Sequence, residues 1–496
     1  MRPREQAVVG VFGIGLAAYW PQFAGLRERL EGYQRKVEQR VAEWASVSSG
    51  GLVDSAPAAV ATGEAFRRSD VDLVLCYVGT YSTSSQVLPV IQRAQAPVVV
   101  LNLQPRAALD YPHTGTAEWL ANCSACCVPE LAGALARSGI PFRQVTGMLE
   151  PEPDMREPWE TAWQEIREWC EAAGVVRNLR QTRIGFLGHT YPGMLDLYSD
   201  FTQHHAQLGT HIEVLEMSDL DERVAAVTDA EIGREERQVR SIFDISEDSP
   251  SDPLARRPAP EEMRWACQVA VGLEKLVEDF DLGGLAYYYR GLAGNRNEQL
   301  AAGMTVGCSL LTARGVPCSG EGDLKNCQAM KIVDLLGAGG SFTEIYAMDF
   351  RQGLLLMGHD GPFHLALAQG RPVLRGLELY HGKRGAGVGV EASVRLGPVT
   401  LLGFTQTPAG RLKLLAAEGE SVAGERLRIG NTNSLMRFAL PPAAWINAWC
   451  REGPTHHGAL GLGHLGQRLE KVASLLDLEL KMIGSEESAD FTDCTD

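Results

Sequence analysis

Continuous apolar runs of strand length are the feature that most restricts the fold of this chain. Two of them, Asp72–Val78 (DLVLCYV) and Pro97–Leu103 (PVVVLNL), flank a stretch with helical spacing at residues 84–94. Hydrophobic residues without alternation indicate strands covered on both faces, as in a parallel sheet. Residues 1–180 are therefore predicted to form an N-terminal, doubly wound α/β domain.

A second region, in which strand-length apolar segments again alternate with helical spacing, predicts a central α/β domain over residues 181–330. Strand-like segments occur at Arg183–Gly188 and His211–Met217, with a helix through Phe201 between them. A long helical pattern at Glu261–Phe280 leads into another apolar segment, Leu282–Arg290. Strands that alternate with helical patterns are typical of βαβ units and a second parallel sheet.

Beyond residue 337 the helical periodicity gives way to short β-rich segments separated by glycines. The expected strands lie at residues 344–350, 354–357, 388–394, 399–406 and 412–417. This pattern predicts a mostly antiparallel C-terminal β domain over residues 331–484. Residues 485–496 are acidic and are predicted to be a disordered tail. The expected fold class is thus α/β, with two doubly wound parallel-sheet domains followed by a β-rich domain.

Charge and cysteine usage restrict the partners and the compartment. The formal net charge of −16 argues against nucleic acid or anionic lipid as a ligand, because both would be repelled. No segment reaches the roughly 20 uninterrupted apolar residues of a membrane span. Eleven cysteines without a repeating framework indicate reduced thiols. We expect a cytoplasmic protein with a small-molecule ligand.

One short cysteine motif, Cys123–Cys127 (CSACC), contains a C-x-x-C spacing. No second C-x-x-C and no nearby histidine completes a zinc site. A structural or incidental role is therefore favoured over zinc binding or redox chemistry.

The segment from Gly320 to Gly361 carries the side chains best suited to metal binding or acid–base chemistry. Glu321 lies between two glycines, Glu344 begins a strand, and His359 ends one. A second histidine feature follows at Thr455–Gly458 (THHG). Two glutamates and two histidines brought together would form an open site for a divalent metal, and the carboxylates could also move protons. Each residue alone is more often an ordinary polar side chain.

Four motifs in this order, GEGDLK, SFTEIY, GHDG and THHG, resemble the L-arabinose isomerase family, within the wider L-fucose/L-arabinose isomerase group. The resemblance extends over nearly the whole chain and also implies three domains. It implies Mn²⁺ or another divalent cation held by Glu321, Glu344, His359 and His457.

The resemblance further implies the interconversion of an aldose and a ketose, of the L-arabinose/L-ribulose type, through a cis-enediol. Glu321 and Glu344 would act as the catalytic acid and base. Tyr19, His189 and His456 are the predicted sugar contacts. His189 follows a strand of the central domain, at the edge where open α/β sheets bind small molecules. A homo-oligomer, a trimer or hexamer in which a neighbour's first domain completes each site, is also implied.

The sugar itself is left open by two departures from the family pattern. The family's Gln-x-Leu-Tyr-Gly-Pro turn is replaced by Leu16–Pro21, which keeps Tyr19 and Pro21 but lacks the glutamine. No His-Gly-Gly segment occurs near residues 122–124. Two alternatives therefore stay open, a non-catalytic cytoplasmic sugar-binding protein and metal-assisted lyase or epimerase chemistry.

Overall fold

The computed structural model describes residues 4–247, 252–290, 294–378 and 386–484. The acidic tail predicted at residues 485–496 lies outside the described residues. The chain divides into two compact units, residues 4–177 and the residues from 178 onward. Among the described residues, no helix is long and apolar enough to cross a membrane.

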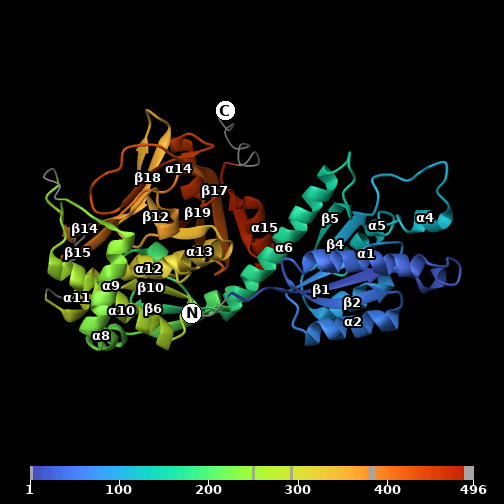
Figure 1. Ribbon diagram of the computed structural model, residues 1–496, viewed down its shortest axis with the longest axis horizontal. Coiled ribbons are helices and arrows are strands. Elements are labelled where there is room, and N and C mark those ends of the chain that lie inside the picture. Colours follow the sequence, from blue (N-terminus) through green and yellow to red (C-terminus); the bar gives the residue numbers. More distant parts are fainter. Residues whose placement is uncertain (1–3, 248–251, 291–293, 379–385, 485–496) are drawn as a thin grey trace. The chain divides into compact units, whose positions relative to one another are not determined.

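The unit of residues 4–177 is built on a parallel sheet of order β2-β1-β3-β4-β5 (Figure 1). This order is typical of doubly wound α/β folds. Its strands are β1 Val8–Ile14, β2 Ser46–Val53, β3 Leu73–Tyr77, β4 Val98–Gln104 and β5 Phe142–Met148. Its helices are α1 Leu26–Val41, α2 Ala56–Arg68, α3 Leu88–Ala94, α4 Thr116–Leu120 and α5 Val128–Arg137. Every residue of β3 is buried, as the continuous apolar run predicted.

A second parallel sheet, of order β11-β10-β6-β7, follows the long helix α6 (Glu157–Gln181). Its strands are β6 Arg183–Gly188, β7 His211–Leu215, β10 Gly284–Tyr288 and β11 Cys318–Ser319. Its helices are α7 Phe201–Leu208, α8 Met217–Ala225, α9 Asp229–Ile242, α10 Pro260–Asp279, α11 Arg296–Ala302, α12 Met304–Ala313 and α13 Leu324–Leu335.

The helix expected to run through Phe201 instead begins there. Asp200 caps α7 by accepting hydrogen bonds from the backbone N–H groups of Thr202 and Gln203. The preceding residues form a loop that contains only the short 3₁₀ turn η3 (Leu195–Leu197). This loop carries Asp196, which contacts His456.

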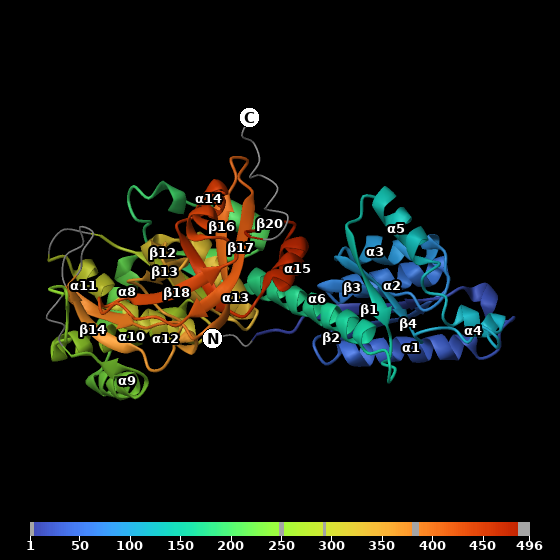
Figure 2. The ribbon, with the colours of Figure 1, turned by 90° about the horizontal axis from the view of Figure 1, so that it is seen from above.

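The C-terminal part is a mostly antiparallel sheet that closes on itself, since β17 pairs with β16 as well as with β18 (Figure 2). Its order is β16-β19-β12-β13-β18-β17-β20. The strands are β12 Gly339–Asp349, β13 Leu354–His359, β16 Gly397–Gln406, β17 Leu412–Val422, β18 Thr432–Phe438, β19 His457–Leu462 and β20 Glu479–Met482. The helices α14 (Pro442–Arg451) and α15 (Gly466–Leu476) follow β18 and β19. Together with the two parallel sheets, this barrel-like sheet confirms the expected fold class.

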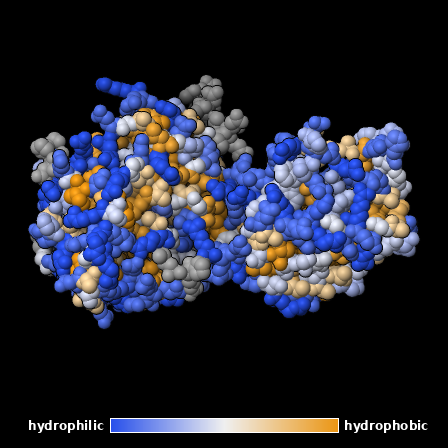
Figure 3. All heavy atoms as spheres, in the orientation of Figure 1, coloured by the Kyte–Doolittle hydropathy of each residue, from blue (hydrophilic) through white to orange (hydrophobic). Residues whose placement is uncertain are grey.

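One buried core joins the central helices to the barrel. It combines Val239, Met263 and Val306 from α9, α10 and α12 with barrel residues such as Leu355 and Leu401. A small sheet, in which β14 (Val373–Glu378) pairs with β15 (Ala386–Glu391), β8 (Asp244–Ile245) and β9 (Ala255–Arg256), adds to this junction. The boundary proposed at residue 330 stays a prediction, because the apolar core continues across it. The face drawn in Figure 3 is mostly hydrophilic, with hydrophobic residues in scattered groups.

Candidate metal centre

Strand pairing in the barrel brings one glutamate and two histidines together. Glu344 on β12 pairs with His457 on β19 and, on its other side, with Gly358 on β13. His359 follows directly at the end of β13. One ligand atom from each of Glu344, His359 and His457 lies within 4.8 Å of the others. The antiparallel register therefore collects side chains from three neighbouring strands.

Glu321 reaches the same histidine from the end of the second parallel sheet. It follows β11 in the 3₁₀ turn η4 (Gly320–Gly322), and its φ of 60° places it in the left-handed region. A non-glycine residue in this conformation stores strain of about 1–3 kcal/mol, and strained residues of this kind cluster at functional sites. Glu321 Oε2 lies 3.5 Å from His457 Nε2 and 3.4 Å from His456 Nε2. Glu321, Glu344, His359 and His457 are called the Glu/His cluster below.

The helix α13 explains how two different sheets meet at this point. It begins immediately after the Glu321 turn, and nearly all of its residues are buried. It packs against β10 and β11 of the parallel sheet and against β12, β16 and β19 of the barrel. Glu321 is thus carried on the turn before a helix that both sheets enclose.

Asp323 orients His457 and was not identified from the sequence. Its Oδ2 lies 2.9 Å from His457 Nδ1, and both side chains are fully buried. Its Oδ1 accepts a hydrogen bond from Asn326 N at 2.9 Å, so Asp323 also caps α13. A proton on Nδ1 leaves the Nε2 lone pair of His457 available, and Nε2 has no hydrogen-bond partner among the described residues. A carboxylate behind a histidine is the usual support of a metal-binding imidazole.

His359 is fixed by its backbone and by an aromatic neighbour. Thr432 Oγ1 accepts from His359 N and donates to His359 O, both at 3.0 Å. The ring of Phe342 lies 4.1 Å from that of His359 and 4.5 Å from that of His457, between centroids. On the other side, His359 Nδ1 lies 3.1 Å from Asp360 Oδ1. These contacts hold the two imidazoles in a buried, partly apolar setting.

His456 is held by a residue from the loop before α7. Asp196 Oδ2 accepts a hydrogen bond from His456 N at 3.1 Å and lies 2.7 Å from His456 Nδ1. Burial alone would lower the pKa of His456, but the Asp196 and Glu321 carboxylates raise it to about 10. Lys325 anchors the loop, because its Nζ donates to Tyr198 O at 2.9 Å and to Ser199 Oγ at 3.1 Å. Asp196, like Asp323, was missed by the sequence analysis.

The other predicted sugar contacts lie in two places. The His189 backbone abuts the Glu321 turn, since a Cβ on Gly322 would lie 2.6 Å from His189 O. Its Nδ1 lies 2.8 Å from Thr190 O, and its ring meets Tyr288 edge-on at 5.2 Å. Tyr19 belongs to the unit of residues 4–177, where its ring packs against Phe23 at 6.1 Å. Sugar contact by Tyr19, His189 and His456 stays a prediction.

The donor set suits a divalent cation. Carboxylate oxygens and imidazole nitrogens together are ligands for manganese, iron or zinc. The buried His457 Nε2 without a hydrogen-bond partner, beside the Glu321 carboxylate, is the atom that a cation would satisfy. The residues therefore fit a metal ion.

Comparison with known proteins finds similarity to L-arabinose isomerases. Residues 199–339 match the sequence model of a family described as the L-arabinose isomerase central domain. A curated L-arabinose isomerase from Clavibacter sepedonicus is 23% identical over 420 residues, which cover 83% of this chain and 79% of the relative. One from Acidothermus cellulolyticus is 23% identical over 432 residues, 84% and 81% of the two chains. The comparisons support an aldose–ketose isomerase enzyme that is similar to the L-arabinose isomerases.

The family resemblance drawn from the four motifs is thereby confirmed. A third relative, the L-arabinose isomerase of Tolumonas auensis, is 20% identical over 439 residues, 83% of this chain and 80% of the relative. The roles of the individual residues in the Glu/His cluster remain predictions.

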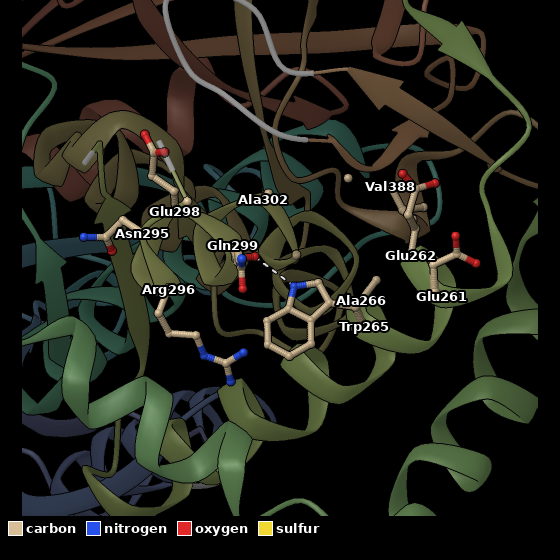
Figure 4. Close-up of a pocket in the computed structure, with 13 residues that line it drawn as sticks. Glu261, Glu262, Trp265, Ala266, Asn295, Arg296, Glu298, Gln299, Ala302 and Val388 are labelled. Atoms are coloured by element: carbon tan, nitrogen blue, oxygen red, sulfur yellow. Dashed lines mark hydrogen bonds between the residues drawn. The ribbon is translucent and has the colours of Figure 1, made fainter. Parts of the chain in front are cut away.

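Two cavities lie on the central part of this isomerase-like chain. A cavity of about 80 Å³ is bordered by Glu321, His359 and three consecutive tyrosines, Tyr287, Tyr288 and Tyr289. A larger cavity of about 370 Å³ lies beside Trp265, whose indole N–H donates to Gln299 O at 2.8 Å (Figure 4). Glu298 and Ala302 line both cavities. The smaller cavity is the one that borders the Glu/His cluster.

Proposed function

We propose that the protein is a divalent-metal-dependent isomerase that interconverts an aldose and a ketose through a cis-enediol. The names of the relatives support a reaction of the L-arabinose/L-ribulose type, while the sugar itself is left open. One observation carries the proposal. Glu321, from the end of a parallel sheet, and Glu344, from the barrel, approach the same His457, whose other nitrogen is held by Asp323.

Glu321, Glu344, His359 and His457 would hold the cation, which we take to be Mn²⁺ or another divalent ion. When bound, such an ion polarises neighbouring sugar oxygens at C1 and C2 as a Lewis acid. The chain's own contribution is positional. Asp323 holds His457 in the tautomer that offers Nε2, and Phe342 packs against both imidazoles.

The two glutamates would divide the proton transfers. One carboxylate takes the proton from C2 and delivers it to C1, which interconverts the two carbonyl positions through the enediol. The other exchanges a proton between the oxygens on C1 and C2. Two carboxylates are needed because one must be ionised while the other holds a proton. His456, between Asp196 and Glu321, and His189, on the adjoining loop, would contact the sugar.

We also propose a homo-oligomer, a trimer or hexamer, in which Tyr19 from a neighbouring chain completes each site. The resemblance to the L-arabinose isomerase family supports this assembly. Light scattering on the purified protein gives the molar mass of the assembly and so the number of chains in it.

The test is a screen of aldoses, L-arabinose among them, for ketose formation with added Mn²⁺ and after chelation. We expect turnover that depends on the metal and that falls by about 10²–10⁴-fold in Glu344→Gln and in Glu321→Gln, the usual contribution of a general acid or base. Glu420→Gln, which alters an exposed glutamate on the same barrel, is the matched control and should keep full activity. Activity retained in Glu344→Gln would remove that residue from the mechanism. Sugar binding without turnover of any aldose would favour the non-catalytic sugar-binding alternative.

A further inference from the structure

The C-x-x-C motif of the first unit is assembled into a close pair of thiols. Cys123 and Cys126 lie between α4 and α5, and their Sγ atoms are 2.9 Å apart. Cys126 Sγ also donates to Cys123 O at 3.4 Å. Cys123 is buried and Cys126 is exposed. The motif therefore places one accessible sulfur directly against one protected sulfur.

We propose that Cys123 and Cys126 form a reversible disulfide, and that the pair is a thiol–disulfide exchange site for a low-molecular-weight disulfide of the glutathione class. This replaces the structural or incidental role that the sequence favoured. The geometry is that of a redox pair, in which an exposed sulfur meets the oxidant and a buried neighbour resolves the mixed disulfide.

The neighbouring groups argue against metal binding by this motif. Cys127 is engaged separately, since its Sγ donates to Ser82 O at 2.9 Å. Across the described residues, neither of the groups able to hold a metal ion contains a cysteine. A zinc site would need four ligands, and Cys123 and Cys126 supply two. Without further ligands, the pair is suited to thiol–disulfide exchange and not to zinc binding.

The exchange takes two balanced steps. The Cys126 thiolate attacks one sulfur of glutathione disulfide, forms a mixed disulfide and releases one glutathione thiolate. Cys123 then loses its proton, attacks Cys126 Sγ and releases the second glutathione, so the two cysteines lose two hydrogens and glutathione disulfide becomes two glutathione molecules. Burial raises the pKa of the Cys123 thiol to about 12, which favours the exposed Cys126 as the sulfur that attacks first.

The pair lies beside the turn that departs from the family's sugar-contacting segment. Leu120 and Ala121, just before the motif, share a buried cluster with Tyr19, Trp20 and Phe23. The disulfide would therefore close next to the predicted sugar contact Tyr19. The proposal itself does not depend on isomerase activity, because its readout is the mass of the protein.

The experiment incubates the full-length protein with glutathione buffers of graded ratio and then blocks free thiols. Intact mass and peptide mapping give the state of each cysteine. We expect a loss of two hydrogens that maps to a Cys123–Cys126 disulfide and that reverses in excess reduced glutathione. Cys123→Ser should instead retain a stable mixed disulfide on Cys126, and Cys126→Ser should give neither product at this motif.

Cys450→Ser is the matched control, since Cys450 is an exposed cysteine of α14, and it should leave the Cys123–Cys126 disulfide unchanged. Three results would overturn the proposal. They are a wild-type protein that stops at the mixed disulfide, a disulfide that maps to Cys127 instead, and thiols at Cys123 and Cys126 that stay reduced at every glutathione ratio.

Discussion

Single residues of the Glu/His cluster are held by partners that are themselves buried. His457 rests on Asp323, and the backbone of His359 rests on Thr432. Gly358 is required next to His359, because a Cβ there would lie 1.8 Å from Thr432 O. Both candidate histidine ligands thus depend on a neighbour that would not touch the cation. The support of the imidazole can be tested separately from the ligands.

Asp323→Asn should weaken divalent-metal binding by about 10–100-fold, the usual effect of removing a carboxylate behind a metal-binding histidine. The physical reason is that the amide no longer fixes the proton of His457 on Nδ1 with a charge. Asparagine still caps α13 well, so the melting temperature should change little. Calorimetric titration with Mn²⁺ measures the affinity. An unchanged affinity would mean that Asp323 serves α13 alone.

The members of the Glu/His cluster could be singled out from the sequence, but the carboxylates beside the histidines could not. Glu321, Glu344 and His359 lie within one segment, beside glycines and at element ends, and such patterns are local. Asp323 is 134 positions from His457, and Asp196 is 260 positions from His456. In the sequence, Asp323 is simply a residue near the start of a helix. Only the packing of α13 between the two sheets brings it beneath His457.

At the scale of elements, the turn of Gly320–Gly322 is a tightly constrained connection of the site. Gly322 has a φ of 69°, and a Cβ on it would lie 2.6 Å from His189 O and 2.8 Å from Thr190 Cα. Tyr191 N donates to Glu321 O at 2.9 Å across the same contact. The turn and the loop after β6 are therefore fitted to each other.

Gly322→Ala should lower the free energy of unfolding by about 2–4 kcal/mol, through backbone strain and the clash with the loop together. Gly353→Ala is the control, since Gly353 has the same φ of 69° and nothing within 4 Å of an added Cβ. It should cost only about 1 kcal/mol. Denaturant titration of both variants gives the comparison. Equal losses would show that the loop yields to the added methyl group.

Elements were predictable where hydrophobic residues cluster and not where a strand is built from small polar ones. The runs at β3 and β4 were identified, and so was α10. Strand β2 (SVSSGGLV) was not, because serine and glycine indicate a loop, yet it pairs with β1 along the sheet edge. Strand β19 (HGALGL) was also missed, because its two glycines and one alanine weaken the strand pattern, although it supplies His457.

A buried contact between α7 and α13 predicts how stability depends on pH. His204 is fully buried, and its Nδ1 hydrogen-bonds Gln328. Burial lowers the pKa of His204 from 6.5 to about 4. The unfolded chain therefore takes up a proton below about pH 6.5 that the folded chain refuses, and stability falls as the pH drops from 6.5 toward 4. Between pH 7 and pH 5 this group should cost about 2 kcal/mol.

His204→Asn removes the titrating group while an amide nitrogen still reaches toward Gln328. We expect the loss of stability between pH 7 and pH 5 to be about 2 kcal/mol smaller in this variant than in the wild type. Urea unfolding at both pH values measures the difference. Parallel pH profiles for the two proteins would contradict it.

For the whole molecule, the parts that share a hydrophobic core are expected to unfold together. Residues 4–177 have their own buried cluster, which includes Phe66 and Val90. Phe243 of the central part and Phe363 of the C-terminal part belong to one other cluster. Sequence patterns separated a central domain from a β-rich one because their periodicities differ. They could not reveal that the helices α9, α10 and α12 cover the barrel, since packing partners leave no local pattern.

Calorimetry on three large-to-small variants should separate the two units. Phe243→Ala and Phe363→Ala each remove a buried ring from the shared core, at a cost of about 3–5 kcal/mol, and should lower the melting temperature of the same transition. Phe66→Ala, equally buried in the core of residues 4–177, should lower that of the other transition. If Phe243→Ala and Phe363→Ala moved different transitions, the central and C-terminal parts would unfold as separate domains. The boundary at residue 330 would then mark a true unit of folding, in spite of the core that crosses it.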